Sequence, residues 1–167
     1  TFTYISTNKE RLGNLLGNYF NSQMQKTLLK DLQGKGFISV PYVNIHNDVP
    51  DGGFPAFMDS PRYATGYTSL FNVIGTVVET HMLKPYKERV KATYDYMVCN
   101  LNFMEQNYNV IKQKRTDNLD QYKIGNKYAI GWKLDSSKYE TMDFKGFEAK
   151  YKPSDVSSKD RLWYDRE

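Results

Sequence analysis

Residues 74–80 read IGTVVET, and they are followed by Pro85 and a long stretch of regularly spaced apolar residues. A continuous apolar run rich in β-branched residues is typical of a parallel strand covered on both faces, so we predict a buried strand at 74–80. Pro85 favours the start of a helix. The apolar residues after it recur at three- and four-residue steps, which predicts a helix to about residue 115 with an apolar stripe, made of Val90, Tyr94, Met97, Val98, Leu101, Met104, Tyr108 and Ile111.

A second helix is expected upstream of this strand. Thr7 and Glu10 have the spacing of a capping box, in which the two side chains satisfy free amides of the first helical turn. Gly34 and Gly36 are expected to end the helix. Its apolar positions recur with helical spacing, at Leu12, Leu15, Leu16, Tyr19, Phe20, Met24, Leu28 and Leu32.

Two shorter segments complete the expected body of the protein. Residues 1–6 (TFTYIS) alternate β-forming residues with small polar ones and predict a strand. Residues 37–42 (FISVPY) predict another strand, and Pro41 places its end at a sheet edge or exit. Helix, strand and helix in this order imply an α/β layer architecture.

Residues 43–67 are rich in Asn, Asp, Gly and Pro, which is the composition of a long irregular loop. Loops of this length in compact domains tend to be functional lids or binding loops. Residues 51–53 (DGG) are a turn signal within it. We expect one or two helical turns at 68–72.

The composition changes after Asn118. Residues 128–134 (YAIGWKL) and 139–151 (YETMDFKGFEAKY) alternate apolar and polar residues without helical period, which predicts β-structure. The last residues are polar except for the cluster at 162–164 (LWY), which would need a partner surface. We therefore divide the chain into an α/β part at 1–117 and a β-rich extension at 118–167.

Length and composition exclude several classes of protein. The chain has 167 residues, 40% of them hydrophobic and 25% charged, as expected for one globular domain with or without part of a second. A net charge of +4 is too small for a nucleic-acid footprint. The basic cluster at 112–115 (KQKR) lies at the expected end of a helix, where cations are favoured. No apolar run approaches the roughly 20 residues that span a bilayer.

Cys99 is the only cysteine, so no intrachain disulfide and no cysteine metal site are expected. Its neighbours Met97, Val98 and Leu101 indicate a buried small residue rather than a nucleophile. The chain has no signal peptide and begins at Thr1 without an initiator Met, so we expect a processed or excised piece of a longer protein.

Glu79 is the strongest candidate for a catalytic residue. It ends an apolar strand, and catalytic groups in open α/β sheets lie at the carboxyl ends of strands. A partly desolvated carboxylate there can take a proton from water and return it; the alternative is a polar strand-end residue paired with a cation. His81 would share the face of Glu79 if the strand continues, either as an acid/base partner or as a hydrogen-bonded structural residue. His46, in the loop, is expected to face solvent.

A catalytic zinc site needs three protein ligands, commonly including two histidines at short spacing. The two histidines of this chain are 35 residues apart, so we expect no metal site built from this chain alone. Serine-nucleophile and phosphate-loop motifs are absent. Residues 60–67 (SPRYATGY) place Arg62, Tyr63 and Tyr67 next to the strand of Glu79. Arg62 suits a peptide C-terminal carboxylate, which it would bind with two hydrogen bonds; the alternative is a surface ion pair.

Residues 60–67 together with 77–97 (VVETHMLKPYKERVKATYDYM) resemble the zinc carboxypeptidases, peptidase family M14, especially the large secreted-type members found in Bacteroidetes. Residues 1–20 (TFTYISTNKERLGNLLGNYF) resemble the segment that directly follows the third zinc ligand in that family. Residues 144–167 resemble the start of the β-rich region after the peptidase domain. The resemblance covers nearly the whole chain and is most specific over 60–86.

The resemblance implies a carboxypeptidase-like three-layer sheet with flanking helices, of which 1–117 would be the C-terminal half. Glu79 would act as general base and then general acid beside a zinc-bound water. Tyr63 or Tyr67 would be the phenol that closes over a peptide substrate, and Arg62 would bind the substrate carboxylate. His81 joins the substrate-binding candidates through its place beside Glu79, without a role taken from the family. The three zinc ligands would lie upstream of Thr1.

The functional prediction is therefore a fragment of a secreted or periplasmic zinc metallocarboxypeptidase, which hydrolyses peptide bonds at substrate C-termini. The zinc is expected in the intact protein, and the fragment is expected to be inactive alone. The alternative is a noncatalytic module that binds peptide or glycan through residues 54–67 and the β-rich extension, which the 14 tyrosines would suit. Self-association through an exposed sheet edge is also expected, because unpaired strand edges invite pairing.

Overall fold

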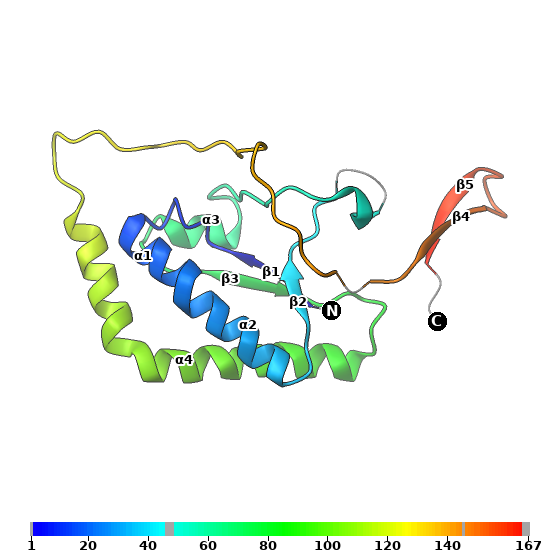
Figure 1. The fold of residues 1–167 in the computed structure, drawn as a ribbon, viewed down its shortest axis with the longest axis horizontal. Coiled ribbons are helices and arrows are strands. Elements are labelled where there is room, and N and C mark those ends of the chain that lie inside the picture. Colours follow the sequence, from blue (N-terminus) through cyan, green and yellow to red (C-terminus); the bar gives the residue numbers. More distant parts are fainter. Residues whose placement is uncertain (1, 46–48, 145, 165–167) are drawn as a thin grey trace.

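Three strands form the central sheet of the computed structural model, which describes residues 2–45, 49–144 and 146–164 (Figure 1). β1 (Phe2–Ser6) lies between β2 (Ser39–Pro41) and β3 (Thr76–Glu79). It runs parallel to β2 and antiparallel to β3. The chain therefore has the mixed α/β architecture that the sequence predicts, and β2 lies at a sheet edge as Pro41 indicates.

β3 is not the buried parallel strand that the apolar run at 74–80 predicts. Its partner among the described residues is the antiparallel β1, and Thr3 lies opposite Glu79. The three residues before Glu79 are half-buried, and Glu79 is exposed. One face of the strand is covered, because Val78 packs against a cluster of Phe2, Leu32, Ala92 and Tyr96. β-branched residues suit a strand covered on one face as well as a strand covered on both. The apolar run at 74–80 therefore did not distinguish these two kinds of strand.

The first helix begins later than the sequence predicts. The Thr7 hydroxyl accepts a hydrogen bond from the Gly75 N–H (2.8 Å) and lies 3.2 Å from the Thr65 carbonyl oxygen, so it is buried between neighbouring elements. The residue before the helix is Gly13, with φ of +78°, a conformation that suits glycine. The predicted capping box of Thr7 and Glu10 is therefore wrong, because tertiary hydrogen bonds take up the hydroxyl.

This helix has three consecutive parts: α1 (Asn14–Tyr19), a π-helical turn η1 (Phe20–Met24) and α2 (Gln25–Gly34). It ends at Gly34, as predicted. Its buried side chains include a series at four-residue steps, Leu16, Phe20, Met24, Leu28 and Leu32. An α-helix has 3.6 residues per turn, so such a series drifts around the helix. The π-turn is wider, with i→i+5 hydrogen bonds, and it opposes this drift.

α4 (Tyr86–Asp120) is the longest helix and follows Pro85, as predicted. It buries Ala92, Tyr96, Cys99 and Phe103 against the first helix and the sheet. Cys99 is buried as predicted, and its burial raises the pKa of the thiol. Most of the stripe at 90–111 that the sequence predicts lies on the other side of the helix and is exposed, whereas its last member, Ile111, is half-buried and packs against the core. Both sides carry apolar residues at helical spacing, so periodicity does not identify the buried one.

The loop predicted at 43–67 is irregular in its described part, apart from a 3₁₀ turn, η2 (Pro50–Gly52). Its end forms α3 (Ala64–Ser69), which begins earlier than the helical turns predicted at 68–72. His46 lies outside the described residues.

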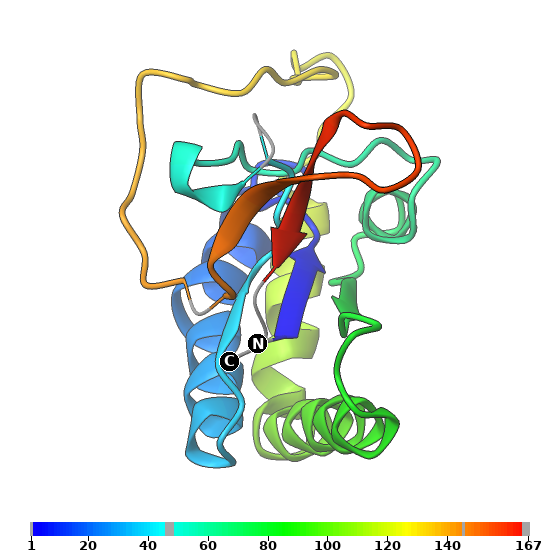
Figure 2. The ribbon, with the colours of Figure 1, turned by 90° about the vertical axis from the view of Figure 1, so that its right-hand side faces the viewer.

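The extension after α4 contains less β-structure than predicted. Described residues between 121 and 148 form no helix or strand, and all except Trp132 are exposed. This segment crosses the side of the molecule opposite the first part of α4 (Figures 1 and 2). β4 (Ala149–Pro153) and β5 (Asp160–Tyr164) then pair as an antiparallel hairpin. The strand predicted at 128–134 is absent, because alternation forms a strand only where a neighbouring strand is available.

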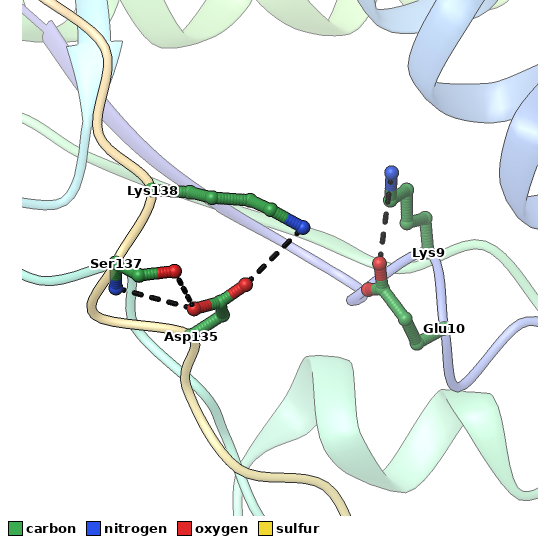
Figure 3. A network of polar contacts seen from close by, with 5 residues as sticks. All are labelled: Lys9, Glu10, Asp135, Ser137 and Lys138. Atoms are coloured by element: carbon green, nitrogen blue, oxygen red, sulfur yellow. Dashed lines mark hydrogen bonds and ion pairs between the residues drawn. The ribbon is translucent and has the colours of Figure 1, made fainter.

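Local polar contacts hold one part of this extension (Figure 3). The Ser137 hydroxyl and backbone N–H both donate to Asp135 Oδ1, and Lys138 Nζ lies 3.2 Å from Asp135 Oδ2. The Ser137 hydroxyl, followed by Lys138, lowers the pKa of Asp135. A second exposed pair, Lys9 with Glu10 at 3.6 Å, comes from the segment before α1. Exposed pairs of this kind contribute little stability.

Candidate functional site

Glu79 is the last residue of β3, and its side chain is exposed. Its backbone carbonyl accepts a hydrogen bond from the Thr3 hydroxyl at 3.4 Å. Within the described residues its carboxylate has no ion pair, so the alternative of a strand-end residue neutralised by a cation is not observed. The strand position that the sequence predicts for Glu79 is confirmed, whereas the covered parallel sheet around it is not.

His81 lies beyond the end of β3, in a turn. Its Nδ1 accepts a hydrogen bond from the Leu83 N–H at 3.2 Å, and its carbonyl accepts one from the Lys84 N–H at 3.0 Å. The ring is exposed. Because β3 ends at Glu79, His81 is not held on the same strand face as that residue. The structure thus gives His81 a turn hydrogen bond and no contact with Glu79.

Tyr63 directly precedes α3 and Tyr67 lies within it, and both have exposed rings. Tyr63 is the N-cap residue of the helix, and its ring lies edge-on to Phe57 at a centroid distance of 5.5 Å. The Tyr67 ring lies 5.1 Å from that of Phe71. Arg62 precedes the helix, is exposed and has no ion pair within the described part of the chain. The surface ion pair that was the alternative role of Arg62 is therefore not seen there.

α3 and Glu79 lie toward opposite ends of β3. Thr7 connects α3 to the start of the strand, because its hydroxyl contacts both Thr65 and Gly75. Glu79 is at the other end, opposite Thr3 of β1. A strand rises about 3.3 Å per residue, so the length of β3 separates Glu79 from α3 and its tyrosines. No hydrogen bond, ion pair or ring contact of the described residues joins Glu79 or His81 to Arg62, Tyr63 or Tyr67.

Asp59 is a buried acid that sequence reasoning did not select. It is fully buried, and its Oδ2 accepts a hydrogen bond from the Thr65 hydroxyl of α3. Its Oδ1 has no partner among the described residues. Burial raises the pKa of Asp59, and its own backbone N–H, the charge of Arg11 and the Gly66 N–H oppose that rise. The sequence signal was its position shortly before Pro61, where polar residues often precede a helix.

Asn118 is a second buried polar residue that sequence reasoning missed. Its Nδ2 donates to the Leu12 carbonyl (2.7 Å) and to Asn72 Oδ1 (2.8 Å). Its Oδ1 lies 3.4 Å from the Leu16 N–H. The residue therefore joins the end of α4 to the start of α1 and to the loop before β3. Its role is structural, since every one of these partners belongs to the fold.

The described residues contain no group of three His, Cys, Asp or Glu side chains that could hold a metal ion. They also contain no helix with both the length and the apolar character needed to cross a membrane. One open pocket of about 330 Å³ lies between α2 and β2 and is lined by Lys26, Leu29, Lys30, Gln33, Ile38 and Ser39. It contains none of the predicted site residues. The candidate site is therefore an exposed carboxylate at the end of β3.

Comparison with protein-family models, with curated proteins and with solved structures found no match to this chain in any of the three. The carboxypeptidase resemblance thus stays a prediction from the sequence.

Proposed function

We propose that this chain is part of a zinc carboxypeptidase-like hydrolase that acts at peptide C-termini, and that Glu79 is its proton-transferring group. The observation that supports the proposal is the position and exposure of the Glu79 carboxylate. Its carboxylate stands exposed at the carboxyl end of β3 and is not neutralised by a described cation. A general base must be free to reach water and substrate, and this residue meets that condition. The resemblance of 60–67 and 77–97 to the family supplies the reaction class.

The described residues do not fit a zinc ion, because no three suitable ligands come together. The metal ligands of the proposed enzyme would have to come from other residues, and no step through zinc is derived for this chain. What the chain itself supplies in this proposal is the carboxylate of Glu79. A site shared by Glu79 with Arg62, Tyr63 and Tyr67 would need one of two things. Either a bound substrate would span the distance between them, or the loop before α3 would move toward Glu79.

The proposal is tested first on residues 1–167 alone. We expect no stoichiometric zinc and no hydrolysis of N-blocked dipeptides with a free C-terminus. The same assay on the full gene product should show zinc-dependent activity, and Glu79→Gln should reduce kcat by roughly 10²- to 10⁴-fold, the usual contribution of a general base. Glu88→Gln, at an exposed site in the first turn of α4, is the matched control. Unchanged kcat in the Glu79→Gln enzyme, or zinc-supported hydrolysis by residues 1–167, would refute the proposal.

A noncatalytic binding module is the second candidate, and exposed aromatic rings favour it. The Trp163 ring of the hairpin has Arg161 at 4.7 Å and Lys152 at 5.6 Å from its centroid. Two further rings are exposed, that of Tyr63 just before α3 and that of Tyr67 within it. Aromatic side chains with a polar group suit peptide and glycan surfaces. Titration with peptides and oligosaccharides should then show binding that Trp163→Ala weakens and Glu79→Gln leaves unchanged.

A further inference from the structure

α4 carries apolar residues on two opposite sides. One side packs into the core through Ala92, Tyr96, Cys99 and Phe103. The other side has six apolar residues at alternating steps of four and three, which we call the outer stripe: Val90, Tyr94, Met97, Leu101, Met104 and Tyr108. Each of these six residues is between 41% and 62% exposed. A helix that is apolar on both sides is ordinarily covered on both, so the outer stripe lacks the cover that its composition predicts.

The part of α4 that carries the outer stripe also has few charged residues. Between residues 92 and 111, Asp95 and Glu105 are the only charged residues. Asp95 lies on the packed side, where it forms ion pairs with Lys91 (2.6 Å) and Lys35 (3.5 Å). Alternating three- and four-residue spacing is the pattern by which helices pack against one another in coiled coils. The occupant that this surface fits is therefore another helix.

The spacing of the outer stripe is the same in both directions along the helix, so the stripe of one copy matches that of a second copy running the opposite way. Met97 and Leu101 lie two residues on either side of position 99, Tyr94 and Met104 lie five, and Val90 and Tyr108 lie nine. An antiparallel two-fold pairing centred there brings each residue of a pair opposite its counterpart in a second copy. Two-fold interfaces require such self-complementarity. α4 is bent, and its part after the bend turns toward α1 (Figure 1). The contact between the two copies is therefore centred on 94–104, before the bend.

The flanking charges favour the antiparallel orientation. In that pairing Glu105 of one copy lies within about two residues, or 3 Å of helix rise, of Lys91 in the second copy. A parallel pairing would instead place Glu105 opposite Asn100 and Lys91 opposite Tyr86 of the second copy, so neither charge would meet an opposite one. Opposite charges at such positions stabilise helix pairs, and the antiparallel pairing alone brings them together. Lys91 keeps its bond to Asp95 in the same helix and is 59% exposed, so its ammonium can serve both carboxylates.

We propose that this chain forms an antiparallel homodimer through the outer stripe of α4. The proposal does not depend on the function of Glu79, because the stripe lies on a different element. It also differs from pairing at the edge of β3, since no strand takes part. Apolar contacts at the centre hold the two copies together, and the Lys91–Glu105 pairs at both ends set their direction.

The mass in solution is the first test. Sedimentation equilibrium of the whole chain should show a shift with concentration from 19.5 kDa toward twice that mass. Leu101→Glu should weaken the dimer at least 10-fold, because it puts a carboxylate at the centre of both copies. Leu119→Glu, on the same helix but outside the stripe, should leave the dimer unchanged. Circular dichroism of both variants checks that the fold is retained, which is expected because both residues are exposed.

Cysteine crosslinking tests the orientation. Tyr94→Cys mixed with Met104→Cys should give a disulfide-linked dimer under mild oxidation, whereas either variant alone should give little. Native Cys99 is buried and serves as the unreactive background. Three results would overturn the proposal: a monomer at every concentration, a dimer insensitive to Leu101→Glu, or efficient crosslinking of Tyr94→Cys with itself, which indicates parallel helices.

Discussion

Residues 2–120 and residues 121–164 differ in burial far more than in composition. Both contain many apolar and aromatic side chains. Every buried apolar residue belongs to the first region, whereas no described residue of the second is buried. In the first region, helices present their apolar side chains to a sheet and to one another. In the second, apolar residues alternate along a chain that has no layer to cover it. Apolar content alone therefore does not build a core; a second surface must be in reach.

The largest expected difference between the regions concerns single apolar residues. Phe20 is 2% exposed in the core cluster of the first helix, and Ile130 is 97% exposed in the extension. Phe20→Ala should lower the free energy of unfolding by about 3–5 kcal/mol, because it leaves a cavity. Ile130→Ala should change it by less than about 0.5 kcal/mol. Urea denaturation followed by circular dichroism measures both; equal effects would show that the comparison is mistaken.

A smaller effect is expected from the polar residue that closes the first region. Asn118→Ala removes the hydrogen-bond donor to the Leu12 carbonyl and to Asn72 Oδ1, and both oxygens then lack that partner in a buried place. The expected loss is about 1–3 kcal/mol of unfolding free energy. Asn102→Ala, at an exposed position of the same helix, is the matched control and should be near neutral. An Asn118→Ala protein as stable as that control would mean that water replaces the lost partner.

The smallest effect concerns the coupling between the two regions. The Arg11 guanidinium lies 5.6 Å from the centre of the Trp132 ring, and Trp132 is half-buried. Trp132→Ala should cost the first region about 0.5–1 kcal/mol, the usual range of a cation–π contact. Trp163→Ala removes a similar contact within the hairpin and should leave the unfolding of the first region unchanged. A larger loss for Trp132→Ala would indicate that the extension is an integral part of the fold.

Local sequence patterns predicted the helices and strands of the first region better than they predicted which elements lie side by side in the fold. The end of the first helix at Gly34 and the start of α4 after Pro85 follow from the conformational preferences of glycine and proline. The direction of β3 could not be predicted, since its antiparallel pairing with β1 depends on partner residues 70 to 76 positions away. The buried side of α4 was chosen wrongly for a related reason: both of its sides are apolar, and only the position of the first helix decides between them.

The candidate site was predictable residue by residue but not as a cluster. Glu79 does end a strand, because a β-branched run followed by polar residues marks a strand end. Tyr63 and Tyr67 do lie on an exposed element. Their separation from Glu79 follows from the Thr7 hydroxyl, which ties α3 to the other end of β3. Nothing around Thr7 in the sequence indicates that contact, because its spacing to Glu10 matches a helix cap equally well.

The π-turn η1 gives the first helix a place that can absorb a change of one residue in length. Its five residues turn the chain by about as much as four α-helical residues, because a π-turn needs more residues to complete each turn. A chain one residue shorter between Phe20 and Met24 would therefore form α-helix there and keep Leu28 and Leu32 on the buried side. The same deletion within α2 would rotate every later residue by about 100°. In an alignment of related chains, single-residue gaps should therefore fall in η1 or in the loops and avoid α2.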